Sequence, residues 1–212
     1  MADLTANHLE QWQGQIRACR QCVTAGYLPT ANPMLRGDAG QVRMLVGQAP
    51  GALGDRTRVP WSGQSGRLLR TWFARAGLDP ECFLDDWYIT SLTKCFPGKA
   101  ASGPGDRAPS AKERALCRPW LEGEISLVRP RVVVTLGRMA ADALIPGARR
   151  QSLAELVGTM HRVDAGYGVV PIVPLPHPSG VGRWLNDPAN RALVEQGLDQ
   201  LASIERTMAH EQ

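Results

Sequence analysis

The sequence lacks the features that mark membrane-bound and secreted proteins. None of its apolar runs is long enough to span a bilayer, and its first residues do not follow the pattern of a signal peptide. Its five cysteines are an odd number, which argues against a framework of disulfide bonds. We therefore expect a cytoplasmic protein without a membrane partner, whose cysteines are either buried thiols or ligands of a metal or cluster.

Internal repeats, low-complexity tracts and signs of a second domain are missing as well. With 212 residues the chain is long enough to bury a sizeable core, and we expect one domain over residues 1–212. The formal net charge is +4. A basic balance of this size permits a polyanionic partner but does not require one.

Apolar runs alternate with helical patterns along the chain, and this alternation predicts the fold. Four runs rich in β-forming residues predict buried strands, at residues 42–46, 87–93, 130–137 and 168–175. Five amphipathic or capped segments predict helices, at residues 3–18, 67–76, 110–127, 139–144 and 188–208. We expect a three-layer α/β/α sandwich with a central, mostly parallel, four-stranded sheet, and irregular or strand-like structure at 153–163.

The chain is organised around residues 45–69. After the first predicted strand it turns through Gly47-Gln48-Ala49-Pro50-Gly51, where the backbone can approach a ligand closely. A polar loop and Pro60-Trp61 precede the next helix. A strand, a tight loop and a helix in this order place ligand sites at the carboxyl end of the strand. By itself, a Gly-Pro-Gly loop is equally consistent with a structural turn.

Four of the five cysteines fall into a pattern that suits a metal site. Cys19 and Cys22 form a CxxC pair, Cys95 directly follows the second predicted strand, and Cys117 lies on the next predicted helix. Four thiolates suit zinc or a [4Fe–4S] cluster, and a CxxC pair alone also occurs in redox proteins. Scattered core thiols are the alternative, and Cys82 stands apart from the pattern.

Two further side chains are candidates for chemistry at the same edge of the sheet. His177 opens the sequence HPSG directly after the last predicted strand. An imidazole in this place can donate to an oxygen on which negative charge develops. Trp61, beside a Gly-rich loop, can stack on a base or a sugar. Packing or capping roles are the alternatives for both residues.

Together these motifs resemble those of the iron–sulfur uracil-DNA glycosylases, family 4 and its relatives within the superfamily. The first family motif, close to GEAPGxxEDxxGxPFVGxAGxLL, is similar without a gap to residues 47–69. Lys94-Cys95 and residues 117–121 (CRPWL) resemble the family's KC…CxPxL segment, and residues 177–179 resemble its HPS motif. The resemblance covers the chain from Cys19 to about Asn190.

The resemblance implies a DNA repair enzyme with an iron–sulfur cluster. Such an enzyme flips uracil or another deaminated base out of DNA, hydrolyses its N-glycosidic bond and leaves an abasic site. No lysine stands out as a Schiff-base nucleophile, so we expect a monofunctional enzyme, acting as a monomer. The implied cofactor is a [4Fe–4S] cluster on four cysteines, Cys19, Cys22, Cys95 and Cys117.

The resemblance also implies catalytic roles. His177 and the backbone around Gly47 and Ala49 would stabilise the leaving base. Gln48 stands where the family has an acidic residue that handles the attacking water. A glutamine cannot act as a base, although it can hold a water by hydrogen bonds. Asp55 is the nearest carboxylate that could replace the acid, and a solvated loop position or turn cap is its alternative.

Substrate recognition departs from the family in two places. Ser91 stands at the position of the usual asparagine that reads the base, and Trp61 at that of the stacking phenylalanine. Contacts with DNA are expected from five residues, Ser179, Arg183, Trp184, Lys99 and Arg107. Trp184 or Val181 would fill the space that the flipped base leaves.

Two other functions remain open at this point. A cluster-bearing DNA-binding protein with weak or no catalysis is possible because Gln48 and Ser91 replace two working residues. A small redox protein would use the cluster for electron transfer, but this function leaves the GQAPG and HPSG motifs unexplained.

Overall fold

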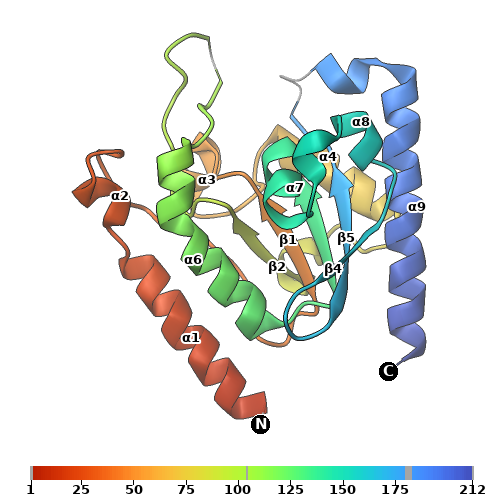
Figure 1. The fold of residues 1–212 in the computed structure, drawn as a ribbon, viewed down its shortest axis with the longest axis horizontal. Helices are drawn as coiled ribbons and strands as arrows, with labels where there is room; N and C mark the ends of the chain where they lie inside the picture. Colours follow the sequence, from red (N-terminus) through yellow and green to blue (C-terminus); the bar gives the residue numbers. More distant parts are fainter. Residues whose placement is uncertain (1, 104, 180–182, 212) are drawn as a thin grey trace.

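The centre of the protein is a five-stranded sheet in the order β2-β1-β3-β5-β4, as shown by a computed structural model that describes residues 2–103, 105–179 and 183–211 (Figure 1). Four strands are parallel: β1 (Arg43–Gly47), β2 (Trp87–Ser91), β3 (Val132–Leu136) and β5 (Val169–Leu175). They confirm the predicted mostly parallel sheet. The fifth, β4 (His161–Asp164), pairs antiparallel with β5 at the edge. It begins in the segment 153–163 that was expected to be irregular or strand-like, but the first residues of that segment form a short helix instead.

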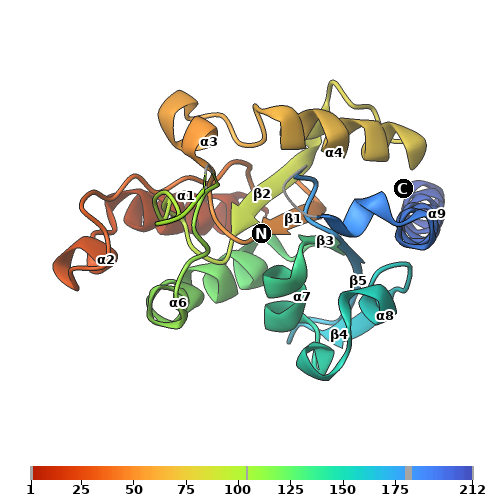
Figure 2. The ribbon, with the colours of Figure 1, turned by 90° about the horizontal axis from the view of Figure 1, so that it is seen from above.

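Helices cover both faces of the sheet and complete the predicted three layers (Figure 2). One face carries α4 (Gln64–Arg75), α5 (Phe83–Asp86) and α9 (Pro188–His210). The other carries α1 (Ala2–Ala18), α6 (Ala111–Val128), α7 (Arg138–Leu144) and α8 (Leu153–Leu156). The remaining turns of helix are short: α2 (Gln21–Thr24), α3 (Ala52–Thr57), η1 (Ala148–Arg150) and η2 (Arg183–Asn186). The sequence predicted only a polar loop where α3 forms.

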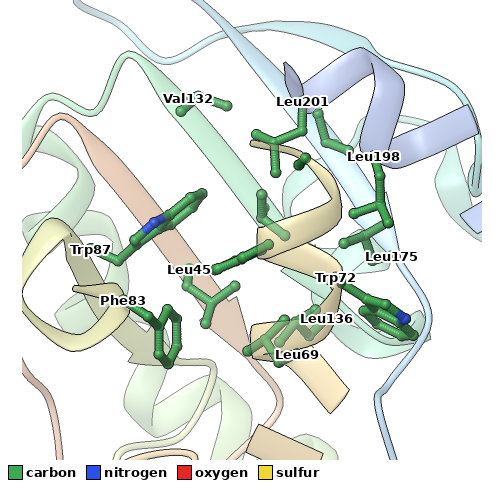
Figure 3. Close-up of a cluster of buried hydrophobic side chains, with 14 of the residues drawn as sticks. Leu45, Leu69, Trp72, Phe83, Trp87, Val132, Leu136, Leu175, Leu198 and Leu201 are labelled. Carbon is green, nitrogen blue, oxygen red and sulfur yellow. The ribbon is translucent and has the colours of Figure 1, made fainter. Parts of the chain in front are cut away.

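Alternation of side chains along the buried strands builds a core on each side of the sheet. Leu45 of β1 packs among Phe73 of α4 and Leu198 of α9, in the cluster shown in Figure 3. Its neighbour Met44 points to the opposite face, where Leu121 of α6 lies in the second cluster. Each such side chain, when fully buried, stabilises the fold by about 1.5–3 kcal/mol.

Side-chain caps fix where two functionally placed helices begin. Ser110 and Glu113 form a capping box at the start of α6, which sets Cys117 two turns into the helix. Asp187 caps α9 by accepting a hydrogen bond from the Ala189 N–H. Both helix starts therefore follow from local sequence.

The topology prepares a crevice at the carboxyl ends of the parallel strands. The connection from β1 to β2 crosses the face of the sheet that α4 covers. The connection from β3 to β5 crosses the opposite face and contains α7. Since β1 and β3 are neighbours, their connections diverge, which is where open α/β sheets bind ligands. None of the helices in the described part of the chain is long and apolar enough to cross a membrane.

Candidate active site

A cavity of about 570 Å³ opens at this edge of the sheet. The segment after β1 lines it with Gly47, Gln48, Ala49 and Trp61. Other elements contribute Ser91, Lys99, Arg107, His177 and Ser179. The structure therefore brings together most of the candidate residues, although they come from four separate parts of the chain.

Trp61 is held in place by two glycines. Its backbone is left-handed, with φ at 55°, and its carbonyl oxygen accepts a hydrogen bond from Arg70 Nη1 at 3.2 Å. A Cβ on Gly66 would lie 1.6 Å from that oxygen, and a Cβ on Gly47 would lie 3.3 Å from the indole ring. Glycine at position 66 therefore lets the backbone of Trp61 adopt this conformation, and glycine at position 47 lets the indole lie close against β1.

We expect Gly66→Ala to destabilise the protein by about 1–3 kcal/mol, because the added methyl group collides with backbone rather than with a mobile side chain. Gly14→Ala is the matched control, since Gly14 lies in α1 with nothing within 4 Å of its Cβ position. That change should stabilise by about 0.5–1 kcal/mol through helix propensity. Urea unfolding measures both, and a shift of the two variants in the same direction would contradict the packing argument.

His177 lies beside the tryptophan in the wall of the cavity. The centroids of the two rings are 5.8 Å apart, with their planes tilted by 44°. The segment after β3 approaches from behind, since a Cβ on Gly137 would lie 3.3 Å from His177 Cβ. Burial lowers the pKa of His177, so the imidazole is neutral at pH 7 and carries one N–H donor.

The polar side chains expected to handle water are placed differently from one another. Gln48 lines the cavity, and its amide makes no hydrogen bond to any other described side chain or backbone group. Asp55 lies on α3 and does not line the cavity. Its Oδ1 accepts a hydrogen bond from Asn32 Nδ2 at 3.0 Å, an arrangement that ties α3 to the preceding loop.

Asp106 is a cavity residue that the sequence analysis missed. It belongs to the loop of residues 96–110, for which only the basic residues Lys99 and Arg107 were considered. Its Oδ2 accepts a hydrogen bond from the Ala52 N–H at 3.0 Å, and its Oδ1 pairs with Lys99 Nζ at 2.8 Å. No pattern in the sequence indicates this approach, because a loop rich in Gly and Pro has no periodicity from which its path could be predicted.

Ser91 ends β2 at the floor of the cavity. It is buried, and its hydroxyl donates to the Thr93 carbonyl at 2.8 Å. Since the single hydroxyl proton is used in this bond, Ser91 Oγ faces a ligand as an acceptor only.

The residues expected to contact DNA divide into two groups. Ser179 and Lys99 lie at the cavity, whereas Arg183 and Trp184 belong to η2, and Trp184 packs against the α4–α9 side of the core. Residues 180–182, including the Val181 named as a wedge, lie outside the described part of the chain. Arg107 lines the cavity but forms a two-pronged ion pair with Glu113, at 2.6 and 2.8 Å, that lowers the pKa of Glu113 to about 2.

Four cysteines line a second, smaller cavity between α2, the end of β2 and α6: Cys19, Cys22, Cys95 and Cys117. Burial raises the pKa of Cys22 to about 11 and that of Cys95 to about 12, and also raises the pKa of Cys117. Cys82 lies elsewhere, exposed at the start of α5. Among the described residues, no group of three or more His, Cys, Asp or Glu side chains could hold a single metal ion.

Two buried donors beside the cysteines lack partners. Thr93 Oγ1 and Trp120 Nε1 have no hydrogen-bond partner within the described residues, and both residues line the cysteine cavity. Buried polar groups are nearly always satisfied, so these two atoms indicate an acceptor that belongs in the cavity.

A buried ion pair separates the two cavities. Lys94 Nζ lies 2.6 Å from Glu124 Oε2 with both side chains almost fully buried, and it also donates to the Ser91 carbonyl at 2.7 Å. The Lys94 N–H donates to Cys117 Sγ at 3.3 Å. Lys94 thus contacts both a cysteine of the smaller cavity and Ser91, which lines the larger one. Nothing in the sequence pairs Lys94 with Glu124, which lies thirty positions away on another element.

Comparison with known proteins gives consistent matches. A family model described as the uracil DNA glycosylase superfamily matches residues 36–202. A type-4 uracil-DNA glycosylase of Pyrobaculum aerophilum is 30% identical over 192 residues, which cover 90% of this chain and 91% of that protein. A type-4 enzyme of Thermotoga maritima is 30% identical over 152 residues, 72% of each chain. A type-5 uracil-DNA glycosylase of Pyrobaculum aerophilum is 33% identical over 124 residues, 51% of this chain and 50% of that protein.

Proposed function

The chain belongs to the uracil DNA glycosylase superfamily, and we propose that it hydrolyses the N-glycosidic bond of uracil in DNA and leaves an abasic site. The observation that carries this proposal is the cavity in which Gln48, Trp61 and His177 meet at the carboxyl ends of the strands. A base that has left the DNA stack could enter it, which favours bases that pair weakly.

The walls of the cavity support recognition of uracil. The indole of Trp61 offers a flat face for stacking on the base. Ser91 Oγ, whose proton is committed to Thr93, can accept the N3–H of uracil. Cytosine has an acceptor at N3 and would face the serine oxygen with like polarity, which costs the desolvation of two unpaired acceptors. Ser91 thus supports uracil over cytosine even without the longer asparagine.

Charge that develops on the leaving base is stabilised by His177. A neutral imidazole retains one N–H, and a buried donor acts in a low-dielectric environment where it is worth more than in water. The leaving group needs no protonation before the bond breaks, because the anion of uracil is spread over the ring and its two carbonyl oxygens.

An assay of base release tests the proposed function. Single- and double-stranded oligonucleotides that contain one uracil are incubated with the protein and cleaved with alkali at abasic sites. We expect cleavage that depends on the protein and on uracil. The alternative is an inactive DNA-binding protein, which the replacement of the family's acid by Gln48 would explain. This alternative is correct if the protein binds the DNA but releases neither uracil nor hypoxanthine, xanthine or ethenocytosine.

The role of Gln48 yields a paired prediction. Because the amide holds water without taking a proton, we expect Gln48→Ala to slow uracil release by a modest factor, about tenfold, at saturating protein. Gln48→Glu introduces a carboxylate of the same shape and should keep or raise the rate. Asp55→Asn is the control and should leave the rate within about threefold of the unaltered protein, since Asp55 faces Asn32. A large loss in Asp55→Asn would instead assign the water to Asp55.

We infer that the cysteine cavity holds a [4Fe–4S] cluster. The donor set supports this, because in such a cluster each thiolate binds a different iron, so four sulfurs surround a volume rather than converge on one ion. The unpartnered donors of Thr93 and Trp120 would find acceptors in the sulfur atoms. Raised thiol pKa values mean that binding must displace protons, as metal binding by cysteines does. The cluster would supply cross-links that order the 96–110 loop, and no step of hydrolysis is assigned to it.

The surroundings of the cavity support binding of DNA along the same edge. We propose that Lys99, Arg183 and Ser179 contact the phosphate backbone, while Trp184 lies beside the space left by the flipped base. Arg107, paired with Glu113, would act through the loop it anchors. We further propose a cytoplasmic monomer with a single domain, since one sheet carries both cavities and base excision requires access to the chromosome.

A further inference from the structure

The cavity contains an acidic side chain although the first motif has none. Asp106 is the only carboxylate among the described residues that line it. It comes from the 96–110 loop, which joins Cys95 to the helix of Cys117 and rises above the start of α6 in Figure 1. An acid is therefore present at the site, supplied by another part of the chain.

The position of Asp106 is fixed by its own loop and by the loop after β1. Residues 98–100 and 105–107 form the two arms of a hairpin, with Lys99 and Asp106 opposite each other and a hydrogen bond from the Arg107 N–H to the Gly98 carbonyl at 3.0 Å. The Ala52 N–H binds Oδ2, and a Cβ on Gly51 would lie 3.3 Å from the same oxygen. A carboxylate held this closely against Gly51 lies next to the loop that contains Gln48.

Asp106 also retains capacity for a further hydrogen bond. An ionised carboxylate offers about four acceptor positions. The Ala52 N–H and Lys99 Nζ each occupy one. The side chain keeps about a third of its surface exposed, so that a water molecule can reach the remaining positions.

We propose that Asp106 is the catalytic carboxylate of this enzyme. It would take the role of the acidic residue that the family has at the position of Gln48. This inference rests on the proposed glycosylase function. The C1′–N1 bond breaks, and its electron pair leaves with the base. A water molecule held by Gln48 forms the new bond to C1′ while its proton passes to Asp106. The carboxyl group then returns the proton to solvent, and the base anion takes one up from solvent. Before the water attacks, the same negative charge stabilises the cationic sugar.

The test separates the charge of Asp106 from its hydrogen bond to Ala52. In Asp106→Asn the side-chain carbonyl can still accept the Ala52 N–H, but the charge is gone. We expect this variant to release uracil about 10²-fold more slowly at saturating protein, the lower range of acid–base contributions. Affinity for an abasic-site duplex, measured alongside, should change by less than about threefold.

The remaining outcomes are decisive. If Asp106→Asn keeps the rate of the unaltered enzyme, or if only Asp106→Ala is slow, Asp106 is a positioning residue and the proposal is overturned. A slow Asp106→Asn variant together with a partly active Asp106→Glu variant would support the catalytic role. An unaltered protein that releases no base contradicts the proposed function itself, a result distinct from failure of this inference, which requires an active parent enzyme.

Discussion

Substitution of Cys117 by alanine is expected to remove the iron and most of the folded protein. Cys117 is buried two turns into α6, and its loss would remove one of the four ligands of the proposed cluster. The binding energy of a structural metal site is folding energy, on the order of 10 kcal/mol for zinc domains. That is comparable with the whole stability of a domain, about 5–15 kcal/mol. Iron content, expected at roughly four per chain in the unaltered protein, and circular dichroism measure the change.

Cys82→Ala is the matched control for the cluster cysteines. Cys82 is exposed, and its thiol donates only to Asp79 Oδ2 at 3.4 Å. Its replacement should leave iron content unchanged and stability within about 0.5 kcal/mol, as for surface substitutions. Stoichiometric zinc in place of iron, in protein purified without oxygen, would contradict the cluster. So would full iron content in Cys117→Ala.

Replacement of His177 by alanine should slow uracil release about 10²–10³-fold, the loss typical for removal of one donor to a developing negative charge. Binding of an abasic-site duplex should change far less, because the product carries no leaving base. The measurement is the single-turnover rate at saturating protein. His161→Ala is the control, since His161 lies at the far edge of the sheet, on β4.

The pH dependence of this rate tests the protonation state of His177. Burial lowers its pKa below the ordinary value of 6.5, so the imidazole is neutral at pH 6.5 and above. The donor is then present throughout the range from pH 6.5 to 8, and His177 should cause no loss of rate as the pH rises through it. A rate that falls as the pH rises through 6.5 would mean that the imidazolium is the active form.

Much of the fold could be predicted because its signals are local. The runs around Leu45 and Val134 are mostly apolar, as buried parallel strands require, and Ser110 caps the start of α6 with its own side chain. The short helix α3 was missed because six residues are too few to show a helical period. The edge strand β4 has only four residues, and its pairing depends on β5 rather than on its own sequence.

The candidate site was predictable where residues are attached to strand ends. Gln48 and His177 follow β1 and β5 directly, so that parallel strands bring them to one edge. The carboxylate was not predictable in the same way. Proximity in sequence favoured Asp55, but α3 turns it toward Asn32, while the hairpin between two cysteines carries Asp106 to the cavity from fifty residues further along.

The left-handed backbone of Trp61 has a consequence for how the enzyme meets its substrate. With its carbonyl held by Arg70 and its ring seated over Gly47, the indole occupies its position before any DNA arrives. The protein then has little to rearrange when a base enters, and the entropy of ordering the stacking surface is lost during folding rather than during binding. Discrimination between bases then depends on how readily each base pair of the duplex opens. The frequency with which a base pair opens, more than any movement of the enzyme, would set how often the cavity is visited.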